Sequence, residues 1–350
     1  MTISFSKGMM DVQRICVIHL NQIGDLVFSL PLLKALRDNF PASEIHSILR
    51  PYLQELLAHS PLVDELIPRK SGVQASLRLL RKIRETHYDL LVTLSNSPGG
   101  LFLAMWSGAR IKAGFRNFPW DLGLDIKEEV EGHHSWYNNL KLLKGLNLEV
   151  KKRDYVGLLT LPTPEPSKGL TGSTATRPRG RYVVVAAGTS VRRNVKAWEE
   201  QKFGELILRL KEKYGLEPVL VGSKGDRAVN DRIIESIRTL DPHQALNSIL
   251  NLAGEISLQE LCSVMKEASL FVGVDSGIMH LASAFDIPVV GIFGPTDPFY
   301  VGPLNEKSVV VREEGIDCMP CYLKGCEDRK CLKRLDVTKV FRSCEQVLGS

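Results

Sequence analysis

Short apolar segments and longer segments of helical periodicity alternate along this chain, and the alternation constrains its fold more than any single motif does. Two parallel strands need a crossover of a dozen or more residues between them, usually a helix. Strands that alternate with helices therefore predict an α/β class with mostly parallel sheets and helices on both faces. In the first half we expect strands over 14–20, 45–49, 62–67 and 88–94, and helices over 25–39, 52–59 and 73–86.

The alternation stops at residues 161–180 and then starts again. This segment holds four prolines and three glycines among many Ser and Thr residues, which predicts a linker or an exposed loop. Beyond it we expect strands over 182–187, 218–221, 270–274 and 289–293, and helices over 199–214, 226–239, 258–268 and 277–285. We find no convincing internal sequence repeat.

A chain of 350 residues has room for about two domains of ordinary size. We therefore expect one domain over 1–160, the linker over 161–180 and a second domain over 181–335. A final helix over 336–350 is expected to pack back on the first domain. Two doubly wound, Rossmann-like domains of this kind would face a central cleft.

The composition excludes several classes of protein. With 44% hydrophobic and 24% charged residues, the chain is neither disordered nor fibrous. The net charge of +5 is too small to imply a nucleic-acid partner. Residues 1–160 carry +4 (20 basic minus 16 acidic), 161–180 carry +2 (3 minus 1) and 181–350 carry −1 (22 minus 23). The basic first half suits an anionic partner or a solvated surface.

The sequence also bears on the cellular compartment. No run approaches the roughly 18–20 apolar residues that a membrane-spanning helix needs, and the longest is near 101–106. Residues 1–11 lack the apolar core of a signal peptide, so we expect a cytoplasmic protein. Seven cysteines in a reducing compartment argue against a disulfide framework.

In an open α/β sheet, ligands bind beyond the carboxyl ends of the strands, so the turns that follow strands are the candidate sites. The first is Asn21-Gln-Ile-Gly-Asp25. Gly24 allows a tight turn, and Asp25 lies at a helix start. The carboxylate of Asp25 is either an N-cap or a general base that deprotonates a hydroxyl nucleophile.

The second candidate turn is Val274-Asp-Ser-Gly-Ile-Met-His280. Ser276 and Gly277 place backbone N–H groups at a helix N-terminus, which suits an anion. His280 lies about one turn further along on the same side. Asp275 either caps the helix or holds a ligand hydroxyl, and the alternative for the whole turn is a capped helix with a packed histidine.

The third candidate turn runs from residue 187 to 198. Thr189, Ser190 and Lys196 supply hydroxyl groups and a point charge that suit a diphosphate, and Arg192 and Arg193 add positive charge. A solvated basic loop is the alternative. The chain has no Walker motif and no Gly-x-Gly-x-x-Gly after a strand, which argues against an ordinary kinase or a dinucleotide-binding protein.

Three further features have alternatives of their own. Cys318, Cys321, Cys326 and Cys331 have one zinc-like Cys-x2-Cys pair, and packed thiols, a structural metal or a disulfide remain open. The basic amphipathic segment 77–84 is either a solvated helix face or a contact to anionic lipid or phosphate. Arg116 and the histidine pair at 133–134 have two interpretations. Either they contact the acceptor, or the histidine pair opens a helix.

These motifs resemble the ADP-heptose:lipopolysaccharide heptosyltransferases, glycosyltransferase family 9, over nearly the whole chain. The resemblance begins with Gln22-Ile-Gly-Asp-Leu26, Leu30-Pro-Leu-Leu-Lys-Ala-Leu-Arg37 and Phe40-Pro-Ala42. Its most specific part is Val274-Asp-Ser-Gly-Ile-Met-His-Leu-Ala282 followed by Gly291-Ile-Phe-Gly-Pro-Thr-Asp-Pro298. The block Cys318-Met-Pro-Cys321 is also familiar from such proteins.

The resemblance implies the two-domain GT-B fold and an inverting sugar transfer. Asp25 matches the family's proposed catalytic base, supported by the turn at Gly24. Donor-binding positions match Thr189, Ser190, Lys196, Asp226, Ile256, Asp275, Ser276, Gly277 and His280. Asp226 stands where the family has Glu and aligns with a ribose contact, and Ile256 aligns with an apolar position near the base.

The resemblance also implies partners. The donor is ADP-L-glycero-D-manno-heptose, and the acceptor is a lipid-anchored inner-core sugar bound by the first domain. The protein would then be a monomer, in the cytoplasm or peripheral at the inner face of the membrane. With no obvious Asp-x-Asp site, no metal or other cofactor is expected.

Other functions fit the same residues. A nucleotide-sugar epimerase of the same two-domain type would form product without an acceptor. A family relative could use a different nucleotide sugar or acceptor. A non-catalytic binding module is disfavoured, because it would need no base across the cleft.

Overall fold

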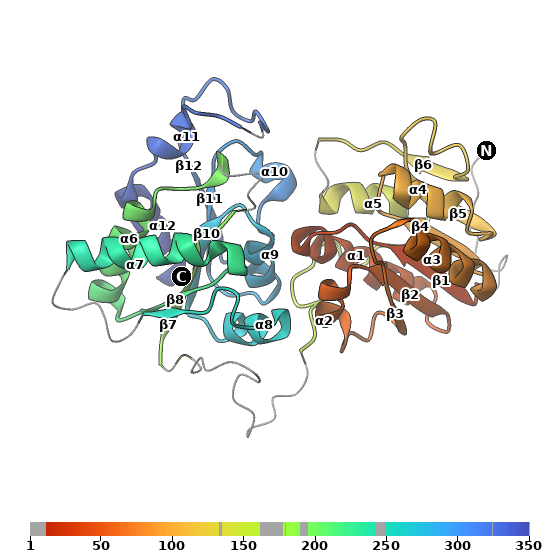
Figure 1. Ribbon diagram of the computed structural model, residues 1–350, viewed down its shortest axis with the longest axis horizontal. Coiled ribbons are helices and arrows are strands. Elements are labelled where there is room, and N and C mark those ends of the chain that lie inside the picture. The colour runs from red at the N-terminus through yellow and green to blue at the C-terminus, as the bar shows by residue number, and fades with distance from the viewer. Residues whose placement is uncertain are drawn as a thin grey trace. The chain divides into compact units, whose positions relative to one another are not determined.

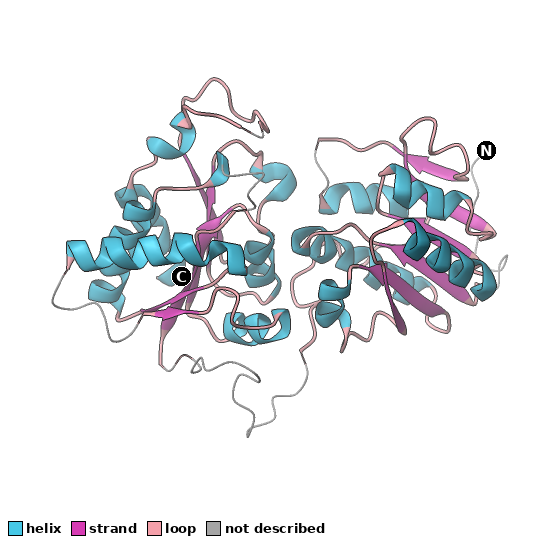
Figure 2. Cartoon of the chain, viewed as in Figure 1, coloured by secondary structure: helices cyan, strands magenta, loops and turns pink. Residues whose placement is uncertain are grey.

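The computed structural model describes residues 12–132, 135–161, 178, 180–189, 195–241, 249–323 and 325–349. The chain divides into two compact units, Met1–Pro162 and Thr163–Ser350, and each is an α/β structure (Figures 1 and 2). The expected linker over 161–180 lies outside the described residues except at 161, 178 and 180.

The first unit is built on a parallel sheet of six strands in the order β3-β2-β1-β4-β5-β6. Their bounds are β1 (Arg14–Ile18), β2 (Glu44–Leu49), β3 (Glu65–Pro68), β4 (Leu90–Thr93), β5 (Ile111–Phe115) and β6 (Ile126–Glu128). Strands β1 and β4 are buried along almost their whole length, as the apolar composition of these segments requires.

Helices connect these strands. They are α1 (Ile23–Asn39), the short η1 (Pro51–Leu53) and α2 (Gln54–Leu57), α3 (Val73–Thr86), α4 (Pro98–Met105) and α5 (Trp136–Gly145). Helix α1 continues through Pro31 and is buried on most of its surface, with α5 packed against it. Helices α3 and α4 share one apolar cluster with β1, β2 and β4.

The second unit repeats this architecture with six parallel strands in the order β12-β11-β10-β7-β8-β9. Their bounds are β7 (Tyr182–Ala186), β8 (Glu217–Leu220), β9 (Leu250–Asn251), β10 (Leu270–Val274), β11 (Val289–Phe293) and β12 (Ser308–Arg312). Counted from its own first strand, each sheet has the order 3-2-1-4-5-6 of a doubly wound fold. The two halves are thus a structural repeat that the sequence does not show.

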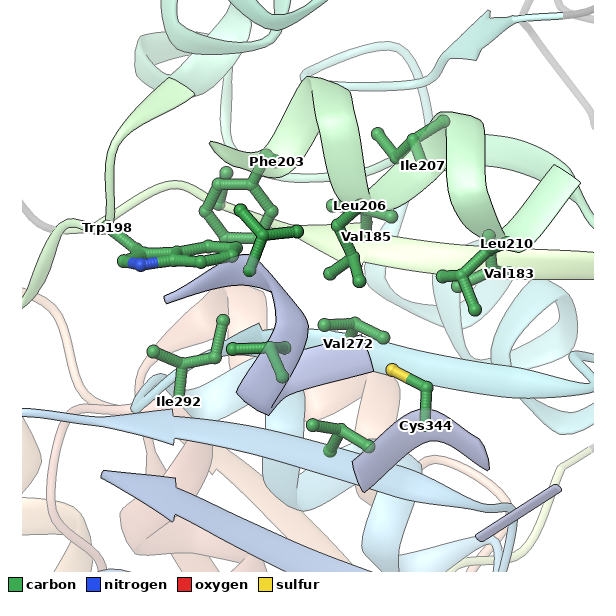
Figure 3. Packing of buried hydrophobic residues seen from close by; sticks show 14 of the residues in the cluster. Val183, Val185, Trp198, Phe203, Leu206, Ile207, Leu210, Val272, Ile292 and Cys344 are labelled. Carbon is green, nitrogen blue, oxygen red and sulfur yellow. The ribbon is translucent and has the colours of Figure 1, made fainter. Parts of the chain in front are cut away.

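The helices of the second unit lie on both faces of its sheet (Figure 1). They are α6 (Glu200–Tyr214), η3 (Lys224–Asp226), α7 (Arg227–Leu240), α8 (Leu258–Lys266), α9 (Gly277–Ala284), α10 (Pro298–Val301), α11 (Lys330–Lys333) and α12 (Val337–Leu348). Figure 3 shows the core on one face, where Trp198 and Phe203 meet edge to face at 4.9 Å beside Val272 and Ile292.

The expected α/β class with two doubly wound units is confirmed. Three elements have the predicted bounds without change, namely α3, β10 and β11. The sequence did not predict α4, β5, β6, α5, β9, β12 and the two short helices α10 and α11. No helix in the described parts of the chain has the length and apolar character needed to cross a membrane.

We expected the final helix to pack back on the first domain, and the structure shows what it packs against within the second unit. Helix α12 packs against α6, β10, β11 and β12 of the second unit. Val340 and Cys344 are fully buried in the same cluster as Val185 and Leu210 (Cys344 is labelled in Figure 3). The apolar stripe of an amphipathic helix shows that one face is buried, but it does not show which surface covers it.

The position of α12 predicts the effect of shortening a core side chain. Val340→Ala should lower the free energy of unfolding by about 1–3 kcal/mol, because it removes two methyl groups from a closed core. Gln346→Ala, at an exposed position on the same helix, should change it by less than about 0.5 kcal/mol. Hydrogen exchange followed by mass spectrometry should find the loss of protection in β10 and β11. Loss confined to the first unit would contradict this packing.

Candidate functional site

In the second unit, β7 and β10 are neighbours, and the strand order reverses between them. Gly273 of β10 pairs with Ala186 of β7, so the turns that leave the two strands emerge side by side. One turn carries Thr189 and the other carries Asp275 and Ser276. This topological switch point is where open α/β sheets bind ligands. The structure therefore brings the second and third candidate turns together.

A buried ion pair joins these two turns. Lys196 Nζ donates a hydrogen bond to Asp275 Oδ2, and the Thr296 hydroxyl donates to the same oxygen at 2.6 Å. Lys196 and Asp275 are each only 8% exposed. The pair is 79 residues apart in sequence and fixes the third turn against the end of β10. Because desolvation of two charges is costly, the pair needs this close geometry and the additional donor.

His280 lies one turn into α9 and feels both charges of the pair. The pKa of His280 is lowered to about 4, mainly by burial; the charge of Asp275 opposes this change and the charge of Lys196 adds to it. His280 is only 3% exposed. It is therefore neutral at pH 7, as the alternative of a packed histidine requires, although it stands beside the charged pair.

The N-terminus of α9 completes this region. Ser276 is the N-cap residue, but its side chain caps no backbone N–H. Within the described part of the chain, the buried Oγ of Ser276 has no hydrogen-bond partner. The first N–H groups of a helix have no intrahelical acceptor, and the helix dipole adds positive potential there. Ser276 and Gly277 thus offer donors to an oxyanion.

Asp226 lies at the ends of β7 and β8. Its carboxylate accepts hydrogen bonds from the Ser223 N–H and hydroxyl, both at 2.7 Å, in a capping box. A Cβ at Gly188 would lie 2.2 Å from Asp226 Cγ, and one at Gly222 would lie 2.7 Å from its Cβ. Two glycines are therefore needed to admit this carboxylate beside the switch point. Asp226 keeps one carboxylate oxygen outside the capping box.

Four other predicted positions remain to be placed. Ile256 is half-buried between β9 and α8. Ser190, Arg192 and Arg193 lie outside the described residues.

In the first unit, Gly24 and Asp25 lie in the first turn of α1, directly after β1 at the switch point of that sheet. The N-cap of α1 is Gln22, so the interpretation of Asp25 as an N-cap is wrong. Asp25 is half-buried. Its charge reaches Tyr52, whose hydroxyl donates a hydrogen bond to the Asn21 carbonyl. Burial is the main cause of the raised pKa of Tyr52, which Asp25 raises further and Arg50 opposes.

A buried histidine fixes the turn that carries Asp25. Ser29 donates to the Leu26 carbonyl at 2.6 Å, so its oxygen accepts from His19 Nδ1 at 3.0 Å. His19 Nε2 then accepts from Ser47 at 3.1 Å. Burial lowers the pKa of His19 to about 3, so the ring is neutral. His19 joins the ends of β1 and β2 to α1.

The remaining candidates are dispersed. Arg116 is exposed at the end of β5, and residues 133 and 134 lie outside the described residues. None of the seven cysteines, which all lie in the described ranges, forms a disulfide, and of the four in the 318–331 block only Cys331 is buried. Burial and the nearby thiols raise the pKa of Cys331. Across the described ranges, no group of three or more His, Cys, Asp or Glu side chains is arranged to hold a metal ion.

Sequence reasoning missed Thr296 and His19. Thr296 follows β11 in a turn, so the rule that selected the other three turns would have found it too. His19 was included in an expected strand, where a polar residue in an apolar run is a signal of its own.

The sequence matches a known protein family. The model for glycosyltransferase family 9 (heptosyltransferase) matches residues 76–332, which is more than half of the chain. Lipopolysaccharide heptosyltransferase 3 of Escherichia coli strain K12 is 26% identical over 341 residues, covering 93% of this chain and 95% of that protein.

Solved structures have the same fold. The glycosyltransferase family 9 protein from Veillonella parvula superposes with a TM-score of 0.79 at 22% identity, covering 97% of this chain and 98% of that chain. The E. coli heptosyltransferase WaaC with ADP has a TM-score of 0.71 at 19% identity, with 96% and 100% covered. These likenesses confirm the expected GT-B fold class.

Breaking the buried ion pair should be costly. Lys196→Met should lower the free energy of unfolding by about 3 kcal/mol or more, because it leaves the Asp275 carboxylate buried without its cation. The double variant that combines Lys196→Met with Asp275→Asn should lose less free energy of unfolding than Lys196→Met alone. Lys307→Met, which removes an exposed pair with Asp286, should cost less than about 1 kcal/mol. Urea denaturation measures all of these, and additive losses in the double variant would contradict the pairing.

The depressed pKa of His280 predicts an acid-sensitive stability. The folded state has a pKa of about 4 and the unfolded state about 6.5, so the unfolded state binds the proton first. The neutral His280 therefore contributes about 3 kcal/mol to the free energy of unfolding. This contribution is complete above pH 6.5 and is lost as the pH falls towards 4. Denaturation at several pH values should show a shallower pH dependence in His280→Gln. An unchanged slope would mean that His280 titrates normally.

Proposed function

Because the chain belongs to glycosyltransferase family 9, we propose that it transfers a heptose from ADP-L-glycero-D-manno-heptose to an inner-core sugar of lipopolysaccharide, with inversion at the anomeric carbon. Membership of the family makes the chain a glycosyltransferase. The observation that carries the proposal is the family match together with the N-terminus of α9, where the Ser276 side chain caps no backbone N–H, at the switch point of the second unit. The match also favours sugar transfer over the epimerase alternative.

The reaction requires one bond to form as another breaks. The acceptor oxygen attacks the anomeric carbon, and the bond from that carbon to the diphosphate oxygen breaks. ADP leaves with the electron pair of that bond, and the acceptor proton passes to a base. The anomeric carbon has oxocarbenium character in the transition state.

In this proposal, Asp25 is the base. A carboxylate that accepts a proton from the attacking hydroxyl can accelerate such a step by about 10²–10⁴-fold. The hydrogen bonds of His19 to Ser29 and Ser47 hold α1 against the ends of β1 and β2. His19 is thus a positioning residue for the turn that carries Asp25. Gly24 is buried directly beside the carboxylate.

The second unit binds the donor in this proposal. Thr189, Ser190, Ser276 and the first N–H groups of α9 contact the diphosphate, and their attraction grows as negative charge develops on the leaving ADP. The proposed role of Lys196 is electrostatic, since its ammonium group is already hydrogen-bonded to Asp275. His280 is neutral and lies within the electrostatic influence of this pair. Asp226 binds the ribose through its remaining carboxylate oxygen, and Ile256 contacts the base.

These contacts supply positive potential without a bound metal ion, so the proposed transfer requires none. The acceptor is lipid-anchored and bound by the first unit. We therefore propose that the enzyme works peripherally at the inner face of the cytoplasmic membrane.

The role of Asp25 predicts a selective defect. Asp25→Asn should lower the rate of heptose transfer by at least about a hundredfold, because amide nitrogen cannot take the proton. Thermal stabilisation by ADP should be nearly unchanged, since the donor site is in the other unit. Mass spectrometry of the glycan product measures the transfer, and an assay without acceptor tests for epimerisation.

A matched control fixes the interpretation. Glu85→Gln, in an exposed pair with Arg81 on α3, should leave transfer unchanged. Retained turnover in Asp25→Asn would reject Asp25 as the base. Selective stabilisation by UDP or GDP would reject ADP-heptose as the donor.

A further inference from the structure

One face of the first unit is rich in exposed apolar side chains. Ten large apolar side chains are exposed in the described parts of the chain, and seven of them belong to this unit. Six of these seven come from α3, the end of α4 and the β5–β6 loop at 116–125; they are Val73, Leu77, Trp106, Phe118, Trp120 and Leu122. Single exposed apolar residues need no explanation, but a gathering of this kind does.

The three segments lie on the same side of the sheet (α3 and α4 are labelled in Figure 1). Buried side chains of both helices share one cluster with Leu124, near the end of the loop. The loop follows α4 along its length. Asn117 donates a hydrogen bond to the Asn96 carbonyl at 2.6 Å before the helix begins, and a Cβ on Gly123 would lie 2.4 Å from Met105 Cγ at the last residue of the helix. We call the outer sides of α3, α4 and this loop the α3–α4 face.

Helix α3, which contains the basic segment 77–84 of the sequence, mixes apolar and basic side chains on its outer side. Leu79 and Ile83 are buried against the sheet. Leu77, Arg81 and Arg84 lie on the opposite side of the helix and are exposed. The helix carries a net charge of +3 (4 basic minus 1 acidic).

This positive charge is only partly compensated. Arg81 pairs with Glu85 at 2.7 Å. Arg78 and Arg84 have no carboxylate within ion-pair distance in the parts of the chain that the structure describes. A partner that covers this face and complements its charge is therefore anionic.

A membrane surface fits this combination better than a protein does. The centre of a protein interface is depleted in charged residues, which gather at its rim. On α3, by contrast, Leu77 stands directly beside Arg78. Segments that lie in the membrane interface combine Trp, Phe and Leu with Lys and Arg, because the apolar groups enter the lipid while the cations contact anionic headgroups. Tryptophan is enriched at that depth.

We propose that the α3–α4 face docks on an anionic phospholipid membrane. Phe118, which is 79% exposed, enters the interface together with Trp120 and Leu122, and the arginines of α3 contact lipid phosphates. That this membrane carries the sugar acceptor rests on the proposed function, whereas the docking face itself does not.

Co-sedimentation of the full chain with vesicles tests the proposal. Vesicles of phosphatidylcholine with about 30% phosphatidylglycerol should bind the protein at least about tenfold more tightly than vesicles of phosphatidylcholine alone, because each cation near an anionic surface contributes roughly a fivefold factor. Higher ionic strength should weaken this binding, because salt screens the charges.

Vesicles with brominated acyl chains test whether the loop enters the lipid. Bromine quenches tryptophan fluorescence at contact, so these vesicles should quench part of the emission of the wild type. Trp106 and Trp120 are the exposed tryptophans among the four of the chain, all of which the structure describes. The quenching should fall in Trp120→Phe, which keeps an apolar ring at the same place.

A matched pair of double variants assigns the binding to this face. Leu77→Ala with Arg84→Gln removes one apolar and one basic side chain from the surface of α3, and should weaken binding to the anionic vesicles by about tenfold. Leu240→Ala with Arg238→Gln makes the same two changes at exposed positions of α7 in the second unit, and should keep the full affinity. All four positions are exposed, so both variants should fold.

Three results would overturn the proposal: equal binding of the wild type to the two kinds of vesicle, equal losses in the two double variants, or unchanged quenching in Trp120→Phe. A dimer in sedimentation velocity that Phe118→Ser with Leu122→Ser dissociates, without binding to vesicles, would show instead that the face joins two copies of the chain. The vesicles contain no sugar acceptor and no transfer is measured. A failure of heptose transfer would therefore reject the proposed function and leave this binding result standing.

Discussion

The order of parallel strands is the constraint on which the rest of this structure depends. In both units the strand order is 3-2-1-4-5-6. The first three strands are added towards one side of the sheet, and the last three are added towards the other side, starting next to the first strand. All carboxyl ends lie at one edge, and the reversal separates two neighbouring turns there. Asp25 follows the first strand of one unit, and Thr189 and Asp275 follow the first and fourth strands of the other. The candidate site residues are thus concentrated where the topology leaves room for ligands.

Burial then selects the charge states of these residues. The Lys196–Asp275 pair is stable in a closed environment because the Thr296 hydroxyl supplies a further hydrogen bond. The same environment keeps His280 neutral. The contrasting place is at Arg69, whose buried Nη1 atom has no hydrogen-bond partner within the described part of the chain. A compensated buried charge fixes a turn, whereas an uncompensated polar group costs free energy.

Much of this could be predicted from the sequence, and the failures have physical reasons. The β10, β11 and α3 bounds follow from apolar runs and helical periodicity between turn residues. Strand β5 was missed because Lys112 and Gly114 interrupt its apolar pattern, and β9 has only two residues. The packing of α12 on α6, β10, β11 and β12 was not predicted, because an apolar stripe does not specify the surface that covers it.

The candidate site, like the fold, could be predicted from the sequence only in part. The sequence selected Lys196 and Asp275 as separate ligand contacts, since local patterns do not show that residues 79 positions apart will pair. Arg50 and Arg69 belong to different turns, and only the assembled sheet brings them together. Local sequence therefore indicates which residue types follow strands, and the fold determines which of them meet.

A crystal structure of the protein with ADP bound would test the proposed donor site most directly. We expect the diphosphate at the N-terminus of α9, within hydrogen-bond distance of Ser276 and beside Thr189, with the Lys196–Asp275 pair intact behind it. ADP bound at the turn of Asp25 in the first unit, or away from the switch point between β7 and β10, would contradict it.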